Sequence, residues 1–387
     1  MKKILVRQLL KKYKPRLVVV FGRYGRQETR SAVQLVISRH FRSFDSSEDR
    51  FFSEFYENLG GFFGILIFLF LKGDFPQFCI IDADPDSHNF AEIKKTLKID
   101  LAVVVAVGDI PSYTDVFAGA QKRSEKIIRE ARKAVNMVYI HDDETIYDLV
   151  REIPIAKRSF GFSDGAAIRA ESPANWIYIK QKVSGGVALK VERDGSLIPF
   201  NLINCYGKRN IYASLAALGA ALFYDINFVD ATQYLGNYEP PAHSFTLHNS
   251  IKSSALITHI FDVTPLSARE AIEFLGELRE EEEVHRLVII LGDVFLRANA
   301  ESEGLHRVLG ELAAHNADEL ILVGDKVIFT EEEAKKYGME EQKISRFITA
   351  EDAGHKIDKK IKKGDAILVL GSHSVEMEKI VEILIEK

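Results

Sequence analysis

Apolar residues in the first part of the chain fall into runs of strand length that alternate with segments of helical period. The run Leu17–Phe21 enters a turn that holds Gly22 and Gly25, and a segment with apolar residues at helical spacing follows. Three further apolar runs predict strands at Phe78–Ile81, Leu101–Val107 and Met137–Ile140. A charged amphipathic segment predicts a helix at residues 118–135. Such alternation predicts a doubly wound parallel sheet that binds ligands at the carboxyl ends of its strands.

The pattern changes in residues 158–203. Short runs there are separated by Ser184-Gly185-Gly186 and Asp194-Gly195, which is typical of antiparallel hairpins. A helix rich in Ala and Leu is then predicted at Asn210–Tyr224. We therefore expect a P-loop-type α/β domain at residues 1–240 that contains a small antiparallel β insertion.

The stretch Tyr238–His243 contains two adjacent prolines and is the best candidate for a linker. Beyond it strands and helices alternate again. The predicted strands are Ala255–Ile260, Leu287–Leu291, Glu319–Val323 and Ala366–Leu370, and the predicted helices are Ser267–Arg279 and Leu305–Asn316. We expect a smaller Rossmann-like domain at residues 245–387, so that the fold class is α/β throughout.

Two segments of the first domain carry no strand signal. Residues 40–58 are polar and aromatic without a clear period, which predicts a long loop. The run Phe62–Leu71 is very apolar, but it is about half of the ~20 residues that a membrane-spanning helix needs. It is therefore predicted to be a buried helix under a sheet.

Composition narrows the class of protein. The chain has 387 residues, 47% hydrophobic and 28% charged, which is typical of a soluble globular protein with more than one domain. Its formal net charge of −5 argues against nucleic-acid binding. Cys79 and Cys205 lie far apart, which favours a reducing cytoplasm without disulfides. Charges interrupt the first apolar residues too early for a signal peptide.

Charge is spread unevenly along the chain. Residues 1–43 contain twelve Lys and Arg side chains against the single acid Glu28. Such a basic end could touch an acidic partner or a membrane surface. A solvated helix face, with Leu5, Leu9 and Leu10 packed inward, is the simpler interpretation.

The turn after the first strand has the frame of a phosphate-binding P-loop without its usual chemistry. Glycines such as Gly22 and Gly25 let backbone N–H groups turn around phosphate oxygens, a Lys reaches the outer phosphates, and a hydroxyl holds Mg²⁺. Here Arg26 and Gln27 stand where Lys and Ser or Thr belong, and Glu28 adds a negative charge. If a nucleotide site is retained, its other candidate residues are Arg23, Thr29 and, in the later helix, Asn210.

Acids follow two of the predicted strands on the edge where ligands bind. Asp82 and Asp84 are the candidate metal ligands, and Asp109 lies on the same edge. Asp142-Asp143 is predicted to cap a helix rather than to bind metal. His243, His248 and His259 are close in sequence but lack the helical spacing of a zinc site.

Three stretches resemble segments of the Mur ligase family. They are Leu291–Leu296 with His306 and Gly310 following, Gly207–Ala217, and Gly364–Lys379, of which the last is the most specific. The nearest branch is the one that adds D-alanyl-D-alanine to the muramoyl tripeptide. The resemblance implies a central ATPase-type domain and a C-terminal Rossmann-like domain.

In that family ATP phosphorylates a substrate carboxylate, an amine attacks the acyl phosphate, and an amide, ADP and phosphate result. The resemblance thus implies an ADP-forming ligase in peptidoglycan synthesis, with ATP and Mg²⁺ as cofactors if the protein is active. Positive charge and Mg²⁺ are needed to neutralise the phosphates. A lysine is carbamylated in the family, and the sequence does not indicate which lysine here, if any, corresponds to it.

Most of the catalytic positions that the resemblance carries over are altered. The P-loop Lys and Thr are Arg26 and Gln27, and Asp82 or Asp84 stands near the family's metal-binding Glu. The family has a second metal-binding residue, a His, in a later segment. That segment corresponds here to Ala106-Val107-Gly108, with Ser112 nearby.

The adenine-contacting helix and the linker depart as well. Asn210 is kept, whereas the family's His and second Asn are Arg209 and Ser214. The linker Gly-Arg is His243-Ser244, and the run Thr258–Pro265 has lost both acids of the family pattern. The segments that build the fold, by contrast, match well, which indicates that fold and function have separated.

Three hypotheses follow, in this order. The first is a catalytically degenerate homologue with a binding, scaffolding or regulatory role, with an intact ligase or a cell-wall enzyme as its protein partner. The second is an active ATP-dependent ligase that uses Arg26, Asp84 and Asn210. The third is a protein that binds another anion through Arg23, Arg26 and Arg30. Because the P-loop turn begins near residue 22, we also expect no N-terminal domain for the nucleotide sugar.

Overall fold

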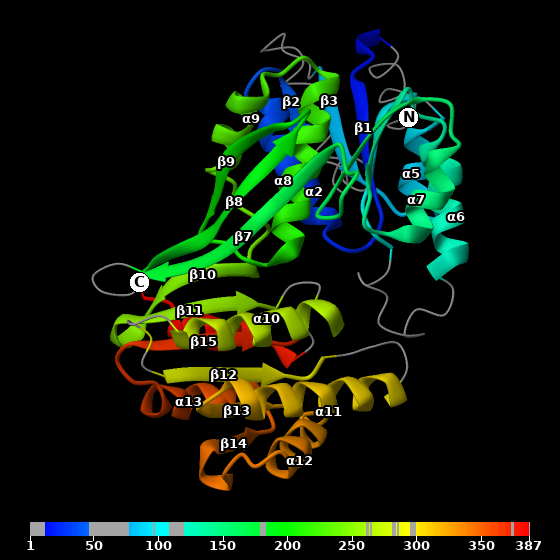
Figure 1. The fold of residues 1–387 in the computed structure, drawn as a ribbon. Coiled ribbons are helices and arrows are strands. Elements are labelled where there is room, and N and C mark those ends of the chain that lie inside the picture. Colours follow the sequence, from blue (N-terminus) through cyan, green and yellow to red (C-terminus); the bar gives the residue numbers. More distant parts are fainter. Residues whose placement is uncertain are drawn as a thin grey trace. The chain divides into compact units, whose positions relative to one another are not determined.

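The computed structural model describes residues 12–45, 77–95, 97–107, 120–178, 183–260, 263, 265–280, 284, 286–294, 299–372 and 375–386 (Figure 1). The chain divides into two compact units. Unit 1 comprises Met1–Ser172, Leu189–Phe200 and Arg209–Tyr238, and unit 2 comprises Pro173–Ala188, Asn201–Lys208 and Glu239–Lys387. None of the described helices is long and apolar enough to cross a membrane.

The first sheet has nine strands in the order β2-β3-β1-β4-β5-β6-β7-β8-β9. Strands β1 to β6 all pair in parallel with one another, as the alternating pattern predicted. The strands are β1 (Arg16–Phe21), β2 (Ser43–Asp45), β3 (Phe78–Asp82), β4 (Ile99–Val104), β5 (Asn136–Ile140), β6 (Ala156–Gly161), β7 (Ile168–Tyr178), β8 (Ser184–Arg193) and β9 (Ser196–Ile203). Strands β1 and β4 are buried along almost their whole length because both faces of the sheet are covered.

Helices lie on both sides of this sheet. Figure 1 shows α5, α6 and α7 on one side of β1, and α2, α8 and α9 on the other. They are α2 (Arg26–Ser38), α5 (His88–Ile93), α6 (Ala120–Ala131), α7 (Glu144–Arg151), α8 (Gly207–Phe223) and α9 (Phe228–Leu235). Asp143 caps α7, as predicted, because its carboxylate accepts the Ile146 N–H at 3.0 Å.

The second sheet lies within unit 2 and has the order β10-β11-β15-β12-β13-β14. Strands β10 and β11 are antiparallel, and the other four pairings are parallel. The strands are β10 (Ser244–Ser250), β11 (Ser254–His259), β12 (Arg286–Gly292), β13 (Glu319–Val323), β14 (Ile344–Phe347) and β15 (Asp365–Leu370). The helices are α10 (Pro265–Glu277), α11 (Asn299–Asn316), α12 (Ile328–Lys336), α13 (Ala350–Lys360) and α14 (Glu378–Leu384), with short 3-10 turns at Ile251–Ser253, Leu278–Glu280 and Glu341–Lys343.

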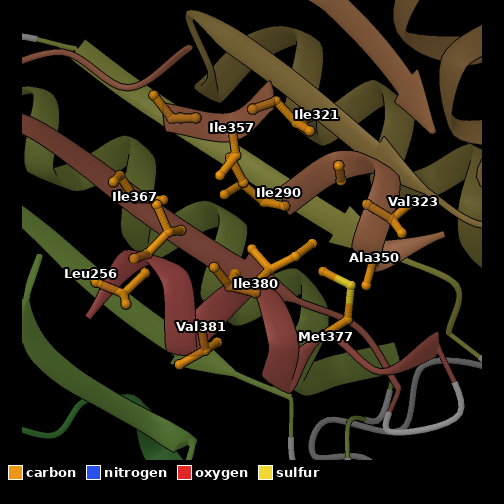
Figure 2. Packing of buried hydrophobic residues seen from close by; sticks show 14 of the residues in the cluster. Leu256, Ile290, Ile321, Val323, Ala350, Ile357, Ile367, Met377, Ile380 and Val381 are labelled. Atoms are coloured by element: carbon orange, nitrogen blue, oxygen red, sulfur yellow. The ribbon is translucent and has the colours of Figure 1, made fainter. Parts of the chain in front are cut away.

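The hydrophobic core of unit 2 forms where α13 and α14 cover one face of this sheet. Ile290 and Ile367 project from the central strands β12 and β15 and are fully buried, and Ile357 and Ile380 reach them from the two helices (Figure 2). Met377, at the start of α14, is also buried in this cluster. This packing fixes the carboxyl ends of β12 and β15 relative to each other.

The structure differs from the expectations in several short elements. Strand β2 lies within the predicted loop 40–58, and β10, whose sequence is largely polar, was not predicted. Helices α12 and α13 and strand β14 were also missed. In α12 and β14 the hydrophobic periodicity is weak, and α13 has few apolar residues among its charged ones. The predicted strand at residues 101–107 ends at Val104. The segment Phe62–Leu71, Asp109 and Ser112 lie outside the described residues.

The core of unit 2 offers the first testable prediction. Ile290→Ala removes three buried carbons from the cluster, so we expect the free energy of unfolding of unit 2 to fall by about 2–5 kcal/mol. Trp176 is the only Trp of the chain and lies in unit 2, so urea unfolding followed by its fluorescence measures this change. Ile348→Ala is the matched control, because Ile348 is 62% exposed, and it should change the free energy by less than about 0.5 kcal/mol. Equal losses in the two variants would contradict the assigned core.

Candidate functional site

The loop between β1 and α2 is held tightly against the neighbouring strand. Gly22 has a φ of 127°, and a side-chain carbon placed there would lie 2.4 Å from Val105 Cγ2 and 2.5 Å from the Val105 carbonyl oxygen. The backbone N–H groups of Arg23 and Tyr24 both donate to the Ala106 carbonyl oxygen, at 2.9 and 3.0 Å. Two amides of the expected phosphate cradle are therefore bonded to the chain itself.

The basic residues of the loop and the first helical turn face an acid at the edge of the sheet. Arg26 Nε lies 3.0 Å from Asp82 Oδ2, and Arg30 Nε lies 3.4 Å from Asp82 Oδ1. Arg26 is 28% exposed and Asp82 20% exposed, so this pair is partly shielded from water. The structure thus brings together the predicted phosphate ligand Arg26 and the predicted metal ligand Asp82, and it pairs their charges with each other.

A second ion pair is buried behind the loop. Arg209 Nη1 lies 3.3 Å from Glu28 Oε1, and their side chains are 3% and 2% exposed. The Arg209 guanidinium also lies over the ring of Tyr24, 4.9 Å from its centroid. Gly25 directly precedes α2 with a φ of 71°, and a side-chain carbon placed there would lie 3.7 Å from the Arg209 carbonyl oxygen. Arg209, which stands where the resemblance predicts a His, is therefore part of the loop's packing.

Asn210 and Thr29 are buried in the same region. The Tyr238 hydroxyl lies 3.0 Å from the Glu28 carbonyl oxygen and 3.4 Å from Asn210 Oδ1. Thr29 donates its N–H to the Gly25 carbonyl oxygen, and its Oγ1 has no hydrogen-bond partner among the described residues. Asn210 and Thr29 are both 0% exposed. Neither side chain is available at the surface of the loop.

Aromatic rings extend this packing toward the end of β6. Tyr24 meets Tyr212 edge-on at 6.5 Å, and Tyr212 meets Phe162 at 5.0 Å. The Tyr212 hydroxyl donates to Asp142 Oδ2 at 2.7 Å, and the same carboxylate accepts the Phe162 N–H. Sequence analysis missed Tyr24, Tyr212 and Tyr238. The sequence offered one signal for this packing, namely Tyr24, a large aromatic residue inside the glycine turn.

The second predicted metal ligand, Asp84, lies apart from this charge network. It is exposed, and its Oδ1 accepts the Asp86 N–H at 2.9 Å in a local turn. Among the described residues, no group of three or more His, Cys, Asp and Glu side chains is placed to hold a metal ion. The metal role of Asp82 and Asp84 therefore stays a prediction.

The three histidines near the linker pack within unit 2, and two of them form hydrogen bonds there. His243 Nδ1 and His248 Nε2 lie 3.2 and 3.1 Å from Thr258 Oγ1, and Thr246 Oγ1 lies 2.9 Å from His248 Nε2. His259 is buried beside Phe245, with the ring centroids 5.6 Å apart. These contacts join β10 to β11 by side chains.

The segment after β12 forms a buried polar hub in unit 2. Asp293 accepts the N–H groups of Asp325 and Val327 at 3.1 and 3.0 Å, which fixes the turn before α12. His306 Nε2 accepts the Val294 N–H at 3.1 Å, so its Nδ1 carries the proton and donates to Thr330 Oγ1 at 2.9 Å. Burial lowers the pKa of His306 to about 4. The family-like residues Asp293 and His306 are thus structural ones here.

Comparisons with known proteins agree with this architecture. The family described as "Mur ligase, glutamate ligase domain" matches residues 257–373. The UDP-N-acetylmuramoyl-tripeptide–D-alanyl-D-alanine ligase of Bacillus subtilis (strain 168) is 25% identical over 181 residues, which is 46% of this chain and 38% of the relative. The match therefore spans well under half of that relative's length.

Solved structures of Mur ligases resemble nearly the whole chain. The MurF ligase of Thermotoga maritima in complex with ADP has a TM-score of 0.72 at 17% identity, covering 99% of this chain and 82% of that one. MurC from the same organism has a TM-score of 0.63 at 16% identity, with coverage of 98% and 77%. A pseudomurein peptide ligase type C from Methanothermus fervidus has a TM-score of 0.61 at 14% identity, with coverage of 97% and 80%.

The fold is therefore that of the Mur ligases, with a nine-stranded sheet followed by a six-stranded, Rossmann-like sheet. The chain is thus similar to the Mur ligases, MurF among them, and its residues 257–373 match the family's glutamate ligase domain.

The buried ion pair provides a prediction for unit 1. Glu28→Met or Arg209→Met alone leaves one charge buried without its partner, so each should cost about 3–5 kcal/mol of unfolding free energy. The double variant should cost much less than the sum. Urea unfolding followed by far-UV circular dichroism reports on both units, whereas Trp176 fluorescence reports on unit 2, where Trp176 lies. The transition seen by circular dichroism and not by fluorescence therefore measures the free energy of unfolding of unit 1.

An exposed ion pair serves as the control for this cycle. Arg151 and Asp148 are 57% and 67% exposed and 3.5 Å apart, so Arg151→Met and Asp148→Met should show a coupling below about 0.5 kcal/mol. Additive losses for Glu28→Met and Arg209→Met would mean that the two buried charges do not stabilise each other.

The pKa of His306 predicts a pH dependence of unit 2. The folded pKa of about 4 lies below the ordinary 6.5, so the unfolded chain binds the proton more readily. The contribution of neutral His306 is complete above pH 6.5 and is lost as the pH falls toward 4, by up to roughly 3 kcal/mol. Urea unfolding of wild type and His306→Gln, followed by Trp176 fluorescence across this range, measures the difference.

His248 titrates in the same range, since burial and the neighbouring His243 lower its pKa to about 4. The contribution of His306 is therefore measured by the difference between the stability–pH profiles of wild type and His306→Gln, and not by the wild-type profile alone. His315→Gln, which removes an exposed His from the same helix, should keep the wild-type slope. A His306→Gln profile parallel to wild type would show that His306 does not titrate on unfolding.

Proposed function

We propose that this chain is a catalytically degenerate Mur ligase homologue that no longer performs normal ATP–Mg²⁺ chemistry. It acts in the cytoplasm as a binding, scaffolding or regulatory component linked to peptidoglycan-precursor synthesis. In this proposal residues 1–240 and 245–387 correspond to the family's central and C-terminal domains. The observation that carries the proposal is the bonding of the Arg23 and Tyr24 N–H groups to the Ala106 carbonyl oxygen.

The charges of the loop support the same conclusion. A phosphate needs cations that are free of other anions when it arrives, and Arg26 already lies against Asp82. Glu28 sits in the first turn of α2, buried against Arg209, so its negative charge opposes the binding of a phosphate at this helix N-terminus. Arg209 is committed to Glu28 and to the face of Tyr24.

The residues present do not fit an ATP–Mg²⁺ complex. Gln27 offers an amide where the family has a Mg²⁺-binding hydroxyl, and Thr29 is buried inside the helix packing. Asp82 would have to leave two arginines to bind a metal ion. We therefore assign no catalytic step to these residues.

Preservation of the scaffold supports a role in binding rather than the loss of all function. Unit 2 keeps a tightly packed core and the polar hub of Asp293 and His306, which together hold the ends of its strands in fixed positions. A protein with this fold and without catalysis can still present surfaces to a partner. The partner we propose is an intact ligase or another cell-wall enzyme.

An active ADP-forming ligase, which would join a carboxylate substrate to an amino acid or peptide, is the second candidate. It is favoured by the position of Arg26 and Asp82 together at the carboxyl edge of the parallel sheet, where ligands of such sheets bind. In that case ATP and Mg²⁺ would be its cofactors, and Arg26 would have to release Asp82 when nucleotide binds.

Titration calorimetry with ATP and with ADP, each with and without Mg²⁺, tests the proposal. We expect no Mg²⁺-dependent binding at nucleotide concentrations of about 1 mM, which excludes binding free energies stronger than about −4 kcal/mol. Micromolar, Mg²⁺-dependent binding would overturn the proposal in favour of an active ligase.

The variant Arg26→Lys/Gln27→Thr makes this test sharper. It restores the two P-loop side chains of the family, but it leaves the Arg23 and Tyr24 amides bonded to Ala106. We expect it to bind MgATP no better than wild type. A gain of micromolar binding would locate the defect in these two side chains and not in the closed loop.

A further inference from the structure

The amino-terminal ends of the strands in unit 1 carry a cluster of exposed cations, on the edge of the sheet opposite the P-loop-type turn. We call this cluster the basic rim. It comprises Lys12, Lys14, Arg16, Arg39, Arg42 and Lys98, all exposed.

Strand register places the basic rim along one edge. Arg16 begins β1 and pairs with Phe78, the first residue of β3, and Lys98 directly precedes β4, whose Ile99 pairs with Leu17. Arg42 directly precedes β2, and its N–H donates to the Gln77 side chain while its carbonyl oxygen accepts the Phe78 N–H. These residues come from three separate segments that the parallel sheet brings together.

Aromatic rings hold several of these cations in place. The Arg16 guanidinium lies 5.6 Å from the Phe78 ring centroid and 5.7 Å from that of Tyr224. Arg39 lies 5.8 Å from the ring of Tyr234, and Lys12 lies 5.0 Å from the ring of Tyr13, which is itself 41% exposed. The basic rim therefore includes fixed cations next to an exposed aromatic ring.

Few acids oppose these charges. Within the described residues, no carboxylate lies at salt-bridge distance from Lys12, Lys14, Arg16, Arg39 or Lys98. The acids nearby are Asp100, which accepts the Tyr224 hydroxyl at 2.9 Å, and Asp225, which follows Tyr224 in the chain. In a chain with a formal net charge of −5, this concentration of positive charge is local.

We propose that the basic rim is a docking surface for an anionic lipid membrane. Cations arrayed along one edge of a sheet can meet many headgroups at once, and the exposed ring of Tyr13 suits the interfacial layer. The adjoining sequence favours lipid over an acidic protein, because residues 1–11 mix Lys and Arg with Leu and Ile as interfacial segments do. The protein would thus work beside the membrane without spanning it.

Co-sedimentation of the full chain with vesicles tests this proposal. We expect binding to phosphatidylcholine vesicles that contain phosphatidylglycerol, no binding to phosphatidylcholine alone, and release at high ionic strength. The variant Lys12→Gln/Lys14→Gln/Lys98→Gln avoids the stacked arginines, so folding should be retained. Each Lys contributes about fivefold to binding, so affinity should fall roughly 100-fold.

The control variant, Lys190→Gln/Lys359→Gln/Lys363→Gln, removes the same charge from exposed lysines outside the basic rim. It should bind like wild type. The proposal is overturned if wild type ignores anionic vesicles at low ionic strength, or if both triple variants lose equal affinity. Binding of poly-L-glutamate through Lys12, Lys14 and Lys98, with no binding to vesicles, would instead identify an acidic polypeptide as the partner.

Discussion

The Ala106 carbonyl oxygen sets the shape of the candidate site. By accepting two successive N–H groups of the turn after β1, it holds that turn against the end of β4. Gly22 makes the contact possible, since any side chain there would meet Val105. The first turn of α2 then starts at a fixed place, which puts Arg26 beside Asp82 and Glu28 beside Arg209. The charges of the site are arranged by this backbone contact.

The two units use buried polar groups in comparable ways. In unit 1 a charged pair lies under an aromatic ring, and in unit 2 a neutral imidazole is bonded on both of its nitrogens. Most buried polar groups in folded proteins are hydrogen-bonded or paired, and each of these networks joins segments far apart in the chain. They give each unit one defined arrangement rather than several.

Sequence analysis recovered the fold better than the site. Strands such as β1 and β13 are continuous apolar runs that both faces of a sheet require, so their positions could be predicted closely. Strand β10 and helix α12 could not, because polar residues in them are stabilised by contacts with distant segments. In the site, the pairing of Arg26 with Asp82 was not foreseen, although both residues were named. Which charge neutralises which depends on distances that only the folded chain fixes.

The buried pair of Glu28 and Arg209 also limits which substitutions the chain tolerates. An uncharged residue in place of Glu28 alone would leave Arg209 buried without an anion, and an uncharged residue in place of Arg209 alone would leave Glu28 without a cation. Each single change therefore passes through a destabilised protein. The two positions are bound to each other, and we expect them to change together or not at all.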